Sequence, residues 1–447
     1  MRWLADFVYV LAGLAYLPVA IYNALVLGKN RHGWSQRFGR VPRYDPTRRR
    51  IWIHAVSLGE VNCTPRLVEA LRERLPDVHV VFSSTTDTGY ARAVQLYGRE
   101  NVFRFPLDFS LVVSRVLRRV HPTVVLLVEL EVWYNLIRIA TARGVPVAVV
   151  NGRLSGNSAR RFRRLGIVAD SMFRRLAWVG AQDQEIAARF EALGVPKSRI
   201  QVTSSLKWDT AEVTDHVDGS GCLARAMCLH HGRPIWVCGS TGPGEEAMLL
   251  NAYRQLCAGW PDLAQSVQGD KRKSTAAEPP ILVLVPRKPE RFDEVARTIA
   301  DAGFTCVRRS EHLDGTQLNG WPESGVALGD TMGELRKFYS LASVVFVGRT
   351  LVPMGGSDPM EAAALGKPLV IGPYTHNFQV PVAALLRNNA LRIVEDPRAL
   401  SDTVRSLLID SAHAEAMGAR AREVVKCNQG AGAKTLDGIV HLLDGVQ

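Results

Sequence analysis

The sequence predicts an α/β fold with two doubly wound, Rossmann-like domains facing a cleft, and a membrane-associated helix at the N-terminus. Two observations predict the domains: apolar runs of strand length alternate with helical stretches, and the same rhythm restarts after residue 233. The runs are almost continuously hydrophobic, as expected of parallel strands covered by helices on both faces. At 447 residues, the chain is also too long for one ordinary core.

The N-terminal helix is predicted by residues 7–27, a run of 21 positions without a charge. At about 1.5 Å per residue, such a helix spans the roughly 30 Å of a bilayer's hydrocarbon core. Basic residues lie almost wholly after it, so the positive-inside rule places the rest of the chain in the cytoplasm. A buried or interfacial amphipathic helix remains open as the alternative, because Pro18 and a row of Tyr and Trp residues accompany the run. We assign residues 1–28 to a membrane anchor helix.

Ten strands are expected in the two domains. In the first domain, residues 29–215, they cover residues 51–56, 78–85, 123–130, 145–150, 176–181 and 199–205; in the second, residues 216–447, they cover residues 234–240, 280–286, 343–348 and 367–372. The boundary is placed near residue 215 because residues 212–221 are polar and contain glycine, as a linker should. Residues 269–280 are expected to form a surface loop, to which no function is assigned.

The cysteines and histidines give no sign of a metal or disulfide framework. The seven cysteines are scattered, odd in number and free of any C-x-x-C pair, which is typical of reduced cytosolic thiols. No His/Cys cluster has the spacing of metal ligands, so neither a structural zinc nor a catalytic metal is expected.

Polar residues follow the predicted strands of the first domain. Glu60 stands behind Gly59 where a strand gives way to a helix, so the helix dipole favours its carboxylate as a proton acceptor. A plain stabilising charge in a first helical turn is the alternative reading. Glu129 and Glu131 end an apolar run, and strand alternation would send both to one side, where they either take part in chemistry or pair with arginines. The basic segment RRFRR, residues 160–164, suggests an anionic lipid partner or simply a solvated face.

The second domain has two glycine-containing loops that open helices, GSTGPGEE at residues 239–246 and MGGSDPMEAAALGKP at residues 354–368. Free amides at such positions hold phosphates, and Arg287 adds a cation at a strand end. The dinucleotide fingerprint, the Walker pattern and the kinase signatures are all absent, which disfavours hydride transfer and ATP-driven phosphoryl transfer. The expected ligand is therefore a nucleotide with few phosphates.

Eight motifs in order resemble those of the 3-deoxy-D-manno-octulosonic acid (Kdo) transferase family of lipopolysaccharide biosynthesis. They are IWIHAVSLGEV, ELEVWYNLI, NGRLS, TSSLKWD, GSTGPGEE, LVPRKPERF, LGDTMGEL and GGSDPMEAAALGKPLVIGPYTHNF, and they run nearly from end to end. The resemblance implies a GT-B-type inverting glycosyltransferase of the cytoplasmic face of the inner membrane. It would move Kdo from CMP-Kdo to the tetraacylated lipid A precursor with no metal or other cofactor.

The resemblance also implies roles for particular residues. Glu60 matches the general base, and Glu129 and Lys207 match positions that stabilise the transition state in the first, acceptor-binding domain. The second, donor-binding domain would bind CMP through Pro286 and Arg287, Met332, Gly333 and Glu334, and Asp358, Pro359, Met360 and Glu361. The expected partners are CMP-Kdo, the anionic lipid A precursor and a membrane, without any nucleic acid.

Ser357 and Asp358 depart from the family's usual GGHN sequence and place an acid beside the nucleotide, so donor affinity or pH dependence is expected to differ. Two alternatives stay open: a GT-B enzyme that uses another nucleotide sugar, and an inactive, membrane-anchored lipid-binding relative.

Overall fold

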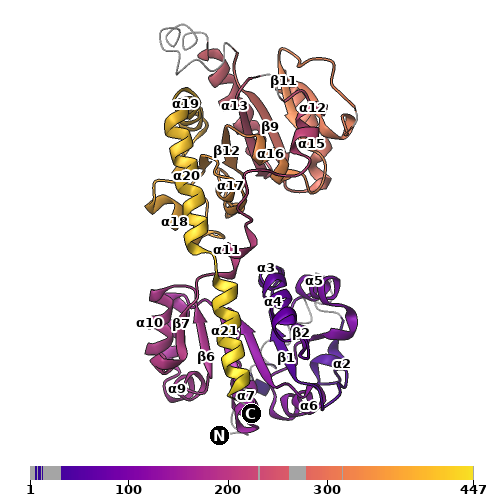
Figure 1. The fold of residues 1–447 in the computed structure, drawn as a ribbon, viewed down its shortest axis with the longest axis vertical. Coiled ribbons are helices and arrows are strands. Elements are labelled where there is room, and N and C mark those ends of the chain that lie inside the picture. Colours follow the sequence, from indigo (N-terminus) through magenta and orange to yellow (C-terminus); the bar gives the residue numbers. More distant parts are fainter. Residues whose placement is uncertain are drawn as a thin grey trace. The chain divides into compact units, whose positions relative to one another are not determined.

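The computed structural model (Figure 1) describes residues 6–7, 9–11, 13, 32–229, 232–260, 278–314 and 316–445. It divides into two compact units, Met1–Thr210 with Asn428–Gln447, and Ala211–Cys427. Each unit holds one parallel sheet of seven strands with helices packed around it. The prediction of two α/β domains with parallel sheets is therefore confirmed.

The first unit contains the following elements: α2 (Trp34–Arg37), β1 (Arg50–His54), α3 (Leu58–Asn62), α4 (Pro65–Arg74), β2 (His79–Ser84), α5 (Asp87–Tyr97), β3 (Val102–Arg104), α6 (Ser110–Val120), β4 (Val124–Val128), α7 (Tyr134–Ala142), β5 (Val147–Gly152), α8 (Gly156–Arg164), α9 (Ile167–Phe173), β6 (Trp178–Ala181), α10 (Gln184–Ala192), β7 (Ile200–Val202), α11 (Leu206–Thr210) and α21 (Ala431–Asp444). Its strand order is β3-β2-β1-β4-β5-β6-β7. The chain reverses direction across the sheet between β1 and β4, so the carboxyl ends of these two strands form a topological switch point.

The sheet of the first unit is buried on both faces. In β1, Trp52 belongs to one hydrophobic cluster, whereas Ile51 and Ile53 belong to the cluster on the opposite face. Because side chains alternate along a strand, both faces need apolar residues. This burial explains why the strands read as continuous hydrophobic runs.

The second unit contains α12 (Ser220–Ala226), β8 (Ile235–Thr241), α13 (Glu245–Ala258), β9 (Ile281–Pro286), α15 (Phe292–Asp301), β10 (Thr305–Arg308), β11 (Gly325–Leu328), α16 (Leu335–Leu341), β12 (Val344–Val347), α17 (Met360–Ala364), β13 (Leu369–Ile371), α18 (Gln379–Arg387), β14 (Leu391–Ile393), α19 (Pro397–Ile409) and α20 (Ser411–Asn428). The strand order is β10-β11-β9-β8-β12-β13-β14. Here the switch point lies between β8 and β12.

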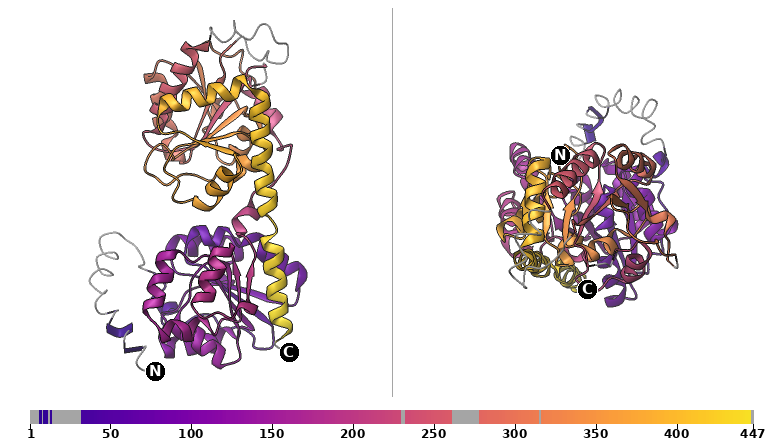
Figure 2. Two further views of the ribbon diagram at one scale, coloured as in Figure 1. Left: turned by 90° about the vertical axis from the view of Figure 1, so that its left-hand side faces the viewer. Right: turned by 90° about the horizontal axis from the view of Figure 1, so that it is seen from above.

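The C-terminal helix α21 belongs to the first unit, although the sequence assigned all residues from 216 to 447 to the second domain. It lies beside α4 and β6, where Figures 1 and 2 show it in yellow among the darker elements. Its buried face includes Ile439 and Leu443, and Gly438 sits so close to Trp178 that an added Cβ would lie 2.6 Å from the indole ring. Asp209 accepts hydrogen bonds from the amides of Gly430 and Gly432, at 2.8 and 2.5 Å, and so fixes the start of the helix.

The predicted membrane helix over residues 7–27 falls mostly outside the residues that the structure describes. Within the described part of the chain, no helix combines the length and the apolar character needed to cross a bilayer. Two described residues at the start of this segment contact the first unit: the Asp6 carboxylate accepts hydrogen bonds from Ser110 at 2.6 and 2.9 Å, and the Tyr9 hydroxyl donates to Asp108 at 2.9 Å. Most of the loop expected at residues 269–280 likewise lies outside the described set.

Candidate active site

Glu60 lies in the first turn of α3, directly after β1. Its Oε2 accepts a hydrogen bond from the Val56 amide at 2.8 Å, and its Oε1 accepts one from the Ser57 hydroxyl at 2.8 Å. Ser57 in turn caps the helix by accepting from the Glu60 amide. Glu60 therefore does stabilise its own helix, as the plainer reading held, yet each carboxylate oxygen keeps a lone pair for a ligand.

The backbone next to Glu60 is open at Gly59. Gly59 lies inside α3, and a Cβ added there would meet only Ser57 Oγ, at 3.9 Å. Burial raises the pKa of the Glu60 carboxyl, and the hydrogen bonds from Val56 and Ser57 oppose that shift. A raised pKa makes the carboxylate a better proton acceptor near neutral pH.

Glu129 begins the turn after β4 and holds a left-handed backbone with φ of 62°. The strand ends at Val128, so the expectation that alternation along the strand orients Glu129 and Glu131 was wrong. For a residue other than glycine, such a conformation costs about 1–3 kcal/mol and persists only where the surroundings enforce it. The turn places the Glu129 carboxylate 3.6 Å from the ammonium group of Lys207 on α11. The structure thus brings together two of the predicted catalytic residues.

Glu131 joins this group as a third carboxylate. Burial, followed by repulsion from Glu60, raises the pKa of Glu131 to about 7, and the hydrogen bond donated by Trp133 only partly opposes this. Glu129 also repels both Glu60 and Glu131. Four residues from three motifs, Glu60, Glu129, Glu131 and Lys207, therefore form one electrostatically coupled cluster at the switch point of the first sheet.

Glu131→Gln is expected to raise the free energy of unfolding by about 1–2 kcal/mol at pH 8 and to change it little at pH 5. The pKa of Glu131 in the folded protein, about 7, exceeds its ordinary value of 4.5, so the folded state binds more protons between these values. Stability is therefore lost as the pH rises through this window, and glutamine abolishes that loss. Urea unfolding at both pH values measures the effect, with the exposed Glu73→Gln as control. An equal effect at pH 5 and pH 8 would contradict the assignment.

Asn151 is a residue of this site that the sequence did not single out, although it begins the NGRLS motif. It has a φ of 54°, a conformation that asparagine tolerates better than most residues. Its Oδ1 accepts hydrogen bonds from the Leu206 amide at 3.1 Å, from Ser205 Oγ at 3.2 Å and from Gln182 Nε2 at 3.1 Å. Asn151 therefore fixes the start of α11 and with it the position of Lys207.

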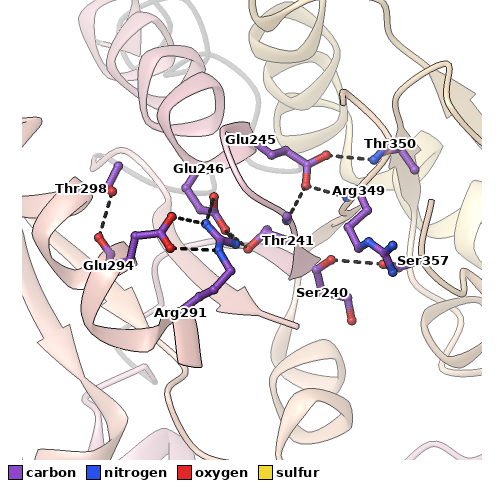
Figure 3. Close-up of polar contacts among 11 residues, drawn as sticks. Ser240, Thr241, Glu245, Glu246, Arg291, Glu294, Thr298, Arg349, Thr350 and Ser357 are labelled. Atoms are coloured by element: carbon purple, nitrogen blue, oxygen red, sulfur yellow. Dashed lines mark hydrogen bonds and ion pairs between the residues drawn. The ribbon is translucent and has the colours of Figure 1, made fainter. Parts of the chain in front are cut away.

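In the second unit, Glu245 holds together the strand ends at the switch point (Figure 3). Its side chain is fully buried and accepts four backbone hydrogen bonds: from Gly242 at 3.1 Å, Arg349 at 2.6 Å, Thr350 at 2.9 Å and Leu351 at 3.0 Å. Nearby, the Ser357 hydroxyl donates to the Ser240 carbonyl at 3.1 Å, as Figure 3 shows. Ser357, one of the two departures from the family sequence, is thus a buried structural contact.

The first two predicted nucleotide segments follow the carboxyl ends of β9 and β11. One of their side chains, Glu334, is already paired with residues of the protein. Pro286 ends β9, and the exposed Arg287 follows it, with its amide donating to the Thr241 carbonyl at 3.2 Å. Met332 is 69% exposed, and Gly333 has a φ of 82°. The Glu334 side chain, in contrast, is paired with Arg309 at 2.8 Å and Lys337 at 3.0 Å. Burial acts to raise the pKa of Glu334, but its hydrogen bonds from Arg309, Thr331 and Lys337 hold the value at about 2.

The last predicted nucleotide segment surrounds the start of α17. Asp358 Oδ1 accepts a hydrogen bond from the Met360 amide at 2.9 Å, with Pro359 between them. Glu361 is exposed at the surface, although the neighbouring protein atoms still raise the pKa of its carboxyl while Arg336 and Arg287 act against that shift. Among the described residues, no group of three or more His, Cys, Asp and Glu side chains is arranged to hold a metal ion.

A family model described as 3-Deoxy-D-manno-octulosonic-acid transferase (kdotransferase) matches residues 32–210. The 3-deoxy-D-manno-octulosonic acid transferase of Bordetella pertussis is 36% identical over 413 residues, which make up 90% of this chain and 90% of that protein. The protein of the same name from Haemophilus influenzae is 32% identical over 395 residues, 87% of this chain and 86% of its own. The solved UDP-GlcNAc 2-epimerase from Neisseria meningitidis is similar in fold alone, with a TM-score of 0.53 and 13% identity over 88% of this chain and 100% of that chain. These matches confirm the resemblance seen in the motifs: the chain belongs to the 3-deoxy-D-manno-octulosonic acid transferase family.

Proposed function

We propose that the protein transfers Kdo from CMP-Kdo to the tetraacylated lipid A precursor of lipopolysaccharide, as a GT-B-type enzyme that inverts the anomeric centre. Membership of the transferase family supports the reaction. One structural observation carries the mechanism: Glu60 has a raised pKa, it follows the open backbone of Gly59, and it is coupled to Glu129 and Glu131. That is the environment a general base requires.

In the proposed step, Glu60 accepts the proton of an acceptor hydroxyl while the hydroxyl oxygen bonds to the anomeric carbon. The bond from that carbon to the phosphate oxygen of the donor breaks, and its electron pair leaves with CMP. Lys207, held 3.6 Å from Glu129, supplies positive charge in the transition state. Asn151 positions Lys207 through α11 and takes no part in proton transfer.

The donor is proposed to bind the second unit at the ends of β8, β9 and β12. Arg287 follows β9 and is exposed, and the exposed Met332 and Gly333 come after the neighbouring β11, whereas Pro286 is the buried last residue of β9. Asp358, Pro359, Met360 and Glu361 belong to the same proposed site, with Glu361 suited to accept hydrogen bonds from ribose hydroxyls. Glu334 is proposed to shape the site through Arg309 and Lys337, because its carboxylate is already paired.

Incubation of the protein with CMP-Kdo and the lipid A precursor tests this function. CMP release and a glycolipid one Kdo heavier by mass spectrometry are the expected products. In the same preparation, CMP at about 100 times its Kd should stabilise the protein by ~2.7 kcal/mol, whereas UDP and GDP should not. Absence of turnover in several detergents would reject the proposal, and a preference for UDP would indicate another nucleotide sugar.

We also propose that the protein works at the cytoplasmic face of the inner membrane, where its acceptor lies. The first unit has a surface suited to lipid: four exposed arginines of α8, Arg160, Arg161, Arg163 and Arg164, precede exposed apolar side chains. Leu165, Ile167 and Val168 are 55%, 81% and 48% exposed. Arginines bind lipid phosphates, and apolar side chains enter the interface beside them.

Ile167→Asp is expected to lower binding to vesicles that contain phosphatidylglycerol by about 10-fold, because burial of one isoleucine contributes roughly 1.5–3 kcal/mol. Co-sedimentation at low and moderate salt measures this binding. Ile393→Asp, which changes an apolar side chain 42% exposed in the second unit, is the matched control. Equal binding of both variants would show that this surface does not meet the membrane.

A further inference from the structure

Arg349 follows β12, and hydrogen bonds hold its backbone at both the amide and the carbonyl. It holds a left-handed conformation with φ of 61°, which is strained for a residue with a side chain. Its amide donates to Glu245 at 2.6 Å, and its carbonyl accepts from the Gly356 amide at 2.9 Å. Glu245 also binds the next two amides, so the left-handed turn is fixed by a fully buried carboxylate (Figure 3).

The side chain of Arg349 lies over the glycine loop after β8. A Cβ added to Gly242 would come within 2.9 Å of Arg349 Cγ and 2.8 Å of Met354 Sδ, so glycine at this position makes room for the arginine. The backbone of Arg287 is adjacent to the same loop, because its amide donates to the carbonyl of Thr241, the neighbour of Gly242. Two arginines therefore follow the neighbouring strands β9 and β12 on either side of β8, and their charges repel each other.

Glu245 attracts Arg349 and Glu361 attracts Arg287, but neither carboxylate forms an ion pair with its arginine. Among the described residues, neither Arg287 nor Arg349 forms an ion pair, and the one hydrogen bond of the Arg349 guanidinium is a long contact of 3.4 Å to the Met354 carbonyl. Both oxygens of the nearby Glu245 are occupied by backbone amides. Burial, followed by repulsion from Arg287, lowers the pKa of Arg349. Like charges left together in this way are typical of a site that is completed by an anionic ligand.

The glycine loops themselves offer less to an anion than the sequence suggested. The Gly242 amide at the start of α13 is taken by Glu245, and the Met360 amide at the start of α17 is taken by Asp358. In both loops a carboxylate of the protein already occupies an amide that the sequence offered to a phosphate. Arginine side chains nearby can supply the positive charge that these occupied amides do not.

We propose that Arg349 and Arg287 together bind an anionic group of the donor, either the phosphate of the nucleotide or the carboxylate of its sugar. This rests on the proposed function, which places the donor at these strand ends, and it adds Arg349 to the binding residues. The planar guanidinium, with paired donors, suits either group. The fixed backbone of Arg349 holds the start of that side chain against Gly242.

Arg349→Gly separates this role from a structural one, because glycine adopts the left-handed conformation without strain. The melting temperature should stay equal or rise, whereas the affinity for CMP or the KM for CMP-Kdo should weaken by about 10- to 100-fold. Arg349→Asn, which tolerates the same backbone, guards against a folding defect in the first variant. Arg392→Ala removes an exposed charge of the same unit away from the site and should change nothing.

Calorimetry with cytidine, CMP and CMP-Kdo distinguishes the two anionic groups. Weaker CMP binding with unchanged cytidine binding assigns Arg349 to the phosphate, and unchanged CMP binding with a raised KM for CMP-Kdo assigns it to the carboxylate. Wild-type affinities for all three ligands in both variants would overturn the inference. If the wild-type protein itself bound neither CMP nor CMP-Kdo, the proposed function would fall, and the inference with it.

Discussion

Glu60→Gln is expected to lower the turnover number about 100- to 10,000-fold, the range by which general bases accelerate reactions. Glutamine has nearly the same shape and can keep the local contacts: its carbonyl accepts from the Val56 amide, and its NH2 group donates to the Ser57 hydroxyl. It has no carboxylate to accept a proton from the acceptor. Release of CMP in the presence of the lipid A precursor measures the loss.

A structural role for Glu60 predicts a different pattern. If the residue served only as a helix cap, Glu60→Gln would shift the melting temperature slightly and leave most of the activity. Glu69→Gln, a substitution of the same kind at an exposed position on α4, controls for the loss of one charge. The affinity for CMP should be that of the wild type, since the donor is proposed to bind the other unit. More than a tenth of wild-type turnover in Glu60→Gln would exclude it as the base.

Nine of the ten predicted strands are almost wholly buried because the sheets are covered on both faces, which makes parallel strands uniformly apolar. The tenth, β7, was recognised although it lies at a sheet edge and leaves two of its three residues exposed. The strands that the sequence did not reveal are short: β3, β10 and β14 lie at sheet edges, and β11 has only four residues. An edge strand has one neighbour and needs less hydrophobic surface; β14, for instance, leaves two of its three residues exposed. A run such as LRI carries too little pattern to be distinguished from a loop.

The hydrophobic periodicity of the sequence could not show to which domain the C-terminal helix α21 belongs. The pattern of α21 shows that the helix has an apolar face, but any apolar surface of suitable shape satisfies that pattern. Its partner is decided by shape: Gly438 admits the Trp178 ring, and Asp209 caps the helix start. Both partners lie more than 200 positions away in the sequence.

The sequence predicted those residues of the candidate site that follow strands or belong to recognisable motifs. Polar residues after parallel strands meet at one edge, which indicated Glu60 and Glu129, whereas Lys207 was named only by the resemblance of its motif to the family. Motifs name residues but not their hydrogen bonds. They did not show that the Glu334 carboxylate is engaged by Arg309, that Asn151 holds α11, or that Glu245 closes the loops around Arg349.

Arg291→Met is expected to lower the free energy of unfolding of the second unit by about 3–5 kcal/mol, as removal of one partner from a buried ion pair does. Arg291 donates two hydrogen bonds to Glu246, at 2.7 and 2.9 Å, and both side chains are almost fully buried. Figure 3 shows Arg291 reaching Glu246 on one side and Glu294 on the other. Without Arg291, the Glu246 carboxylate keeps one side-chain hydrogen bond, from Thr241 at 2.7 Å, which is too little to offset its desolvation.

The double variant Arg291→Met with Glu246→Met separates the loss of a contact from the cost of a stranded charge. Removing both partners of a buried pair is often close to neutral, so the double variant should be more stable than Arg291→Met alone. Glu294 pairs with the same arginine, but its side chain is 52% exposed. Glu294→Gln should therefore lower the free energy of unfolding by less than about 1 kcal/mol. Urea unfolding of the wild type, Arg291→Met, Glu246→Met and the double variant completes the cycle. A double variant as unstable as Arg291→Met would show that Arg291 acts by packing alone, and that the charge of Glu246 is solvated by other means.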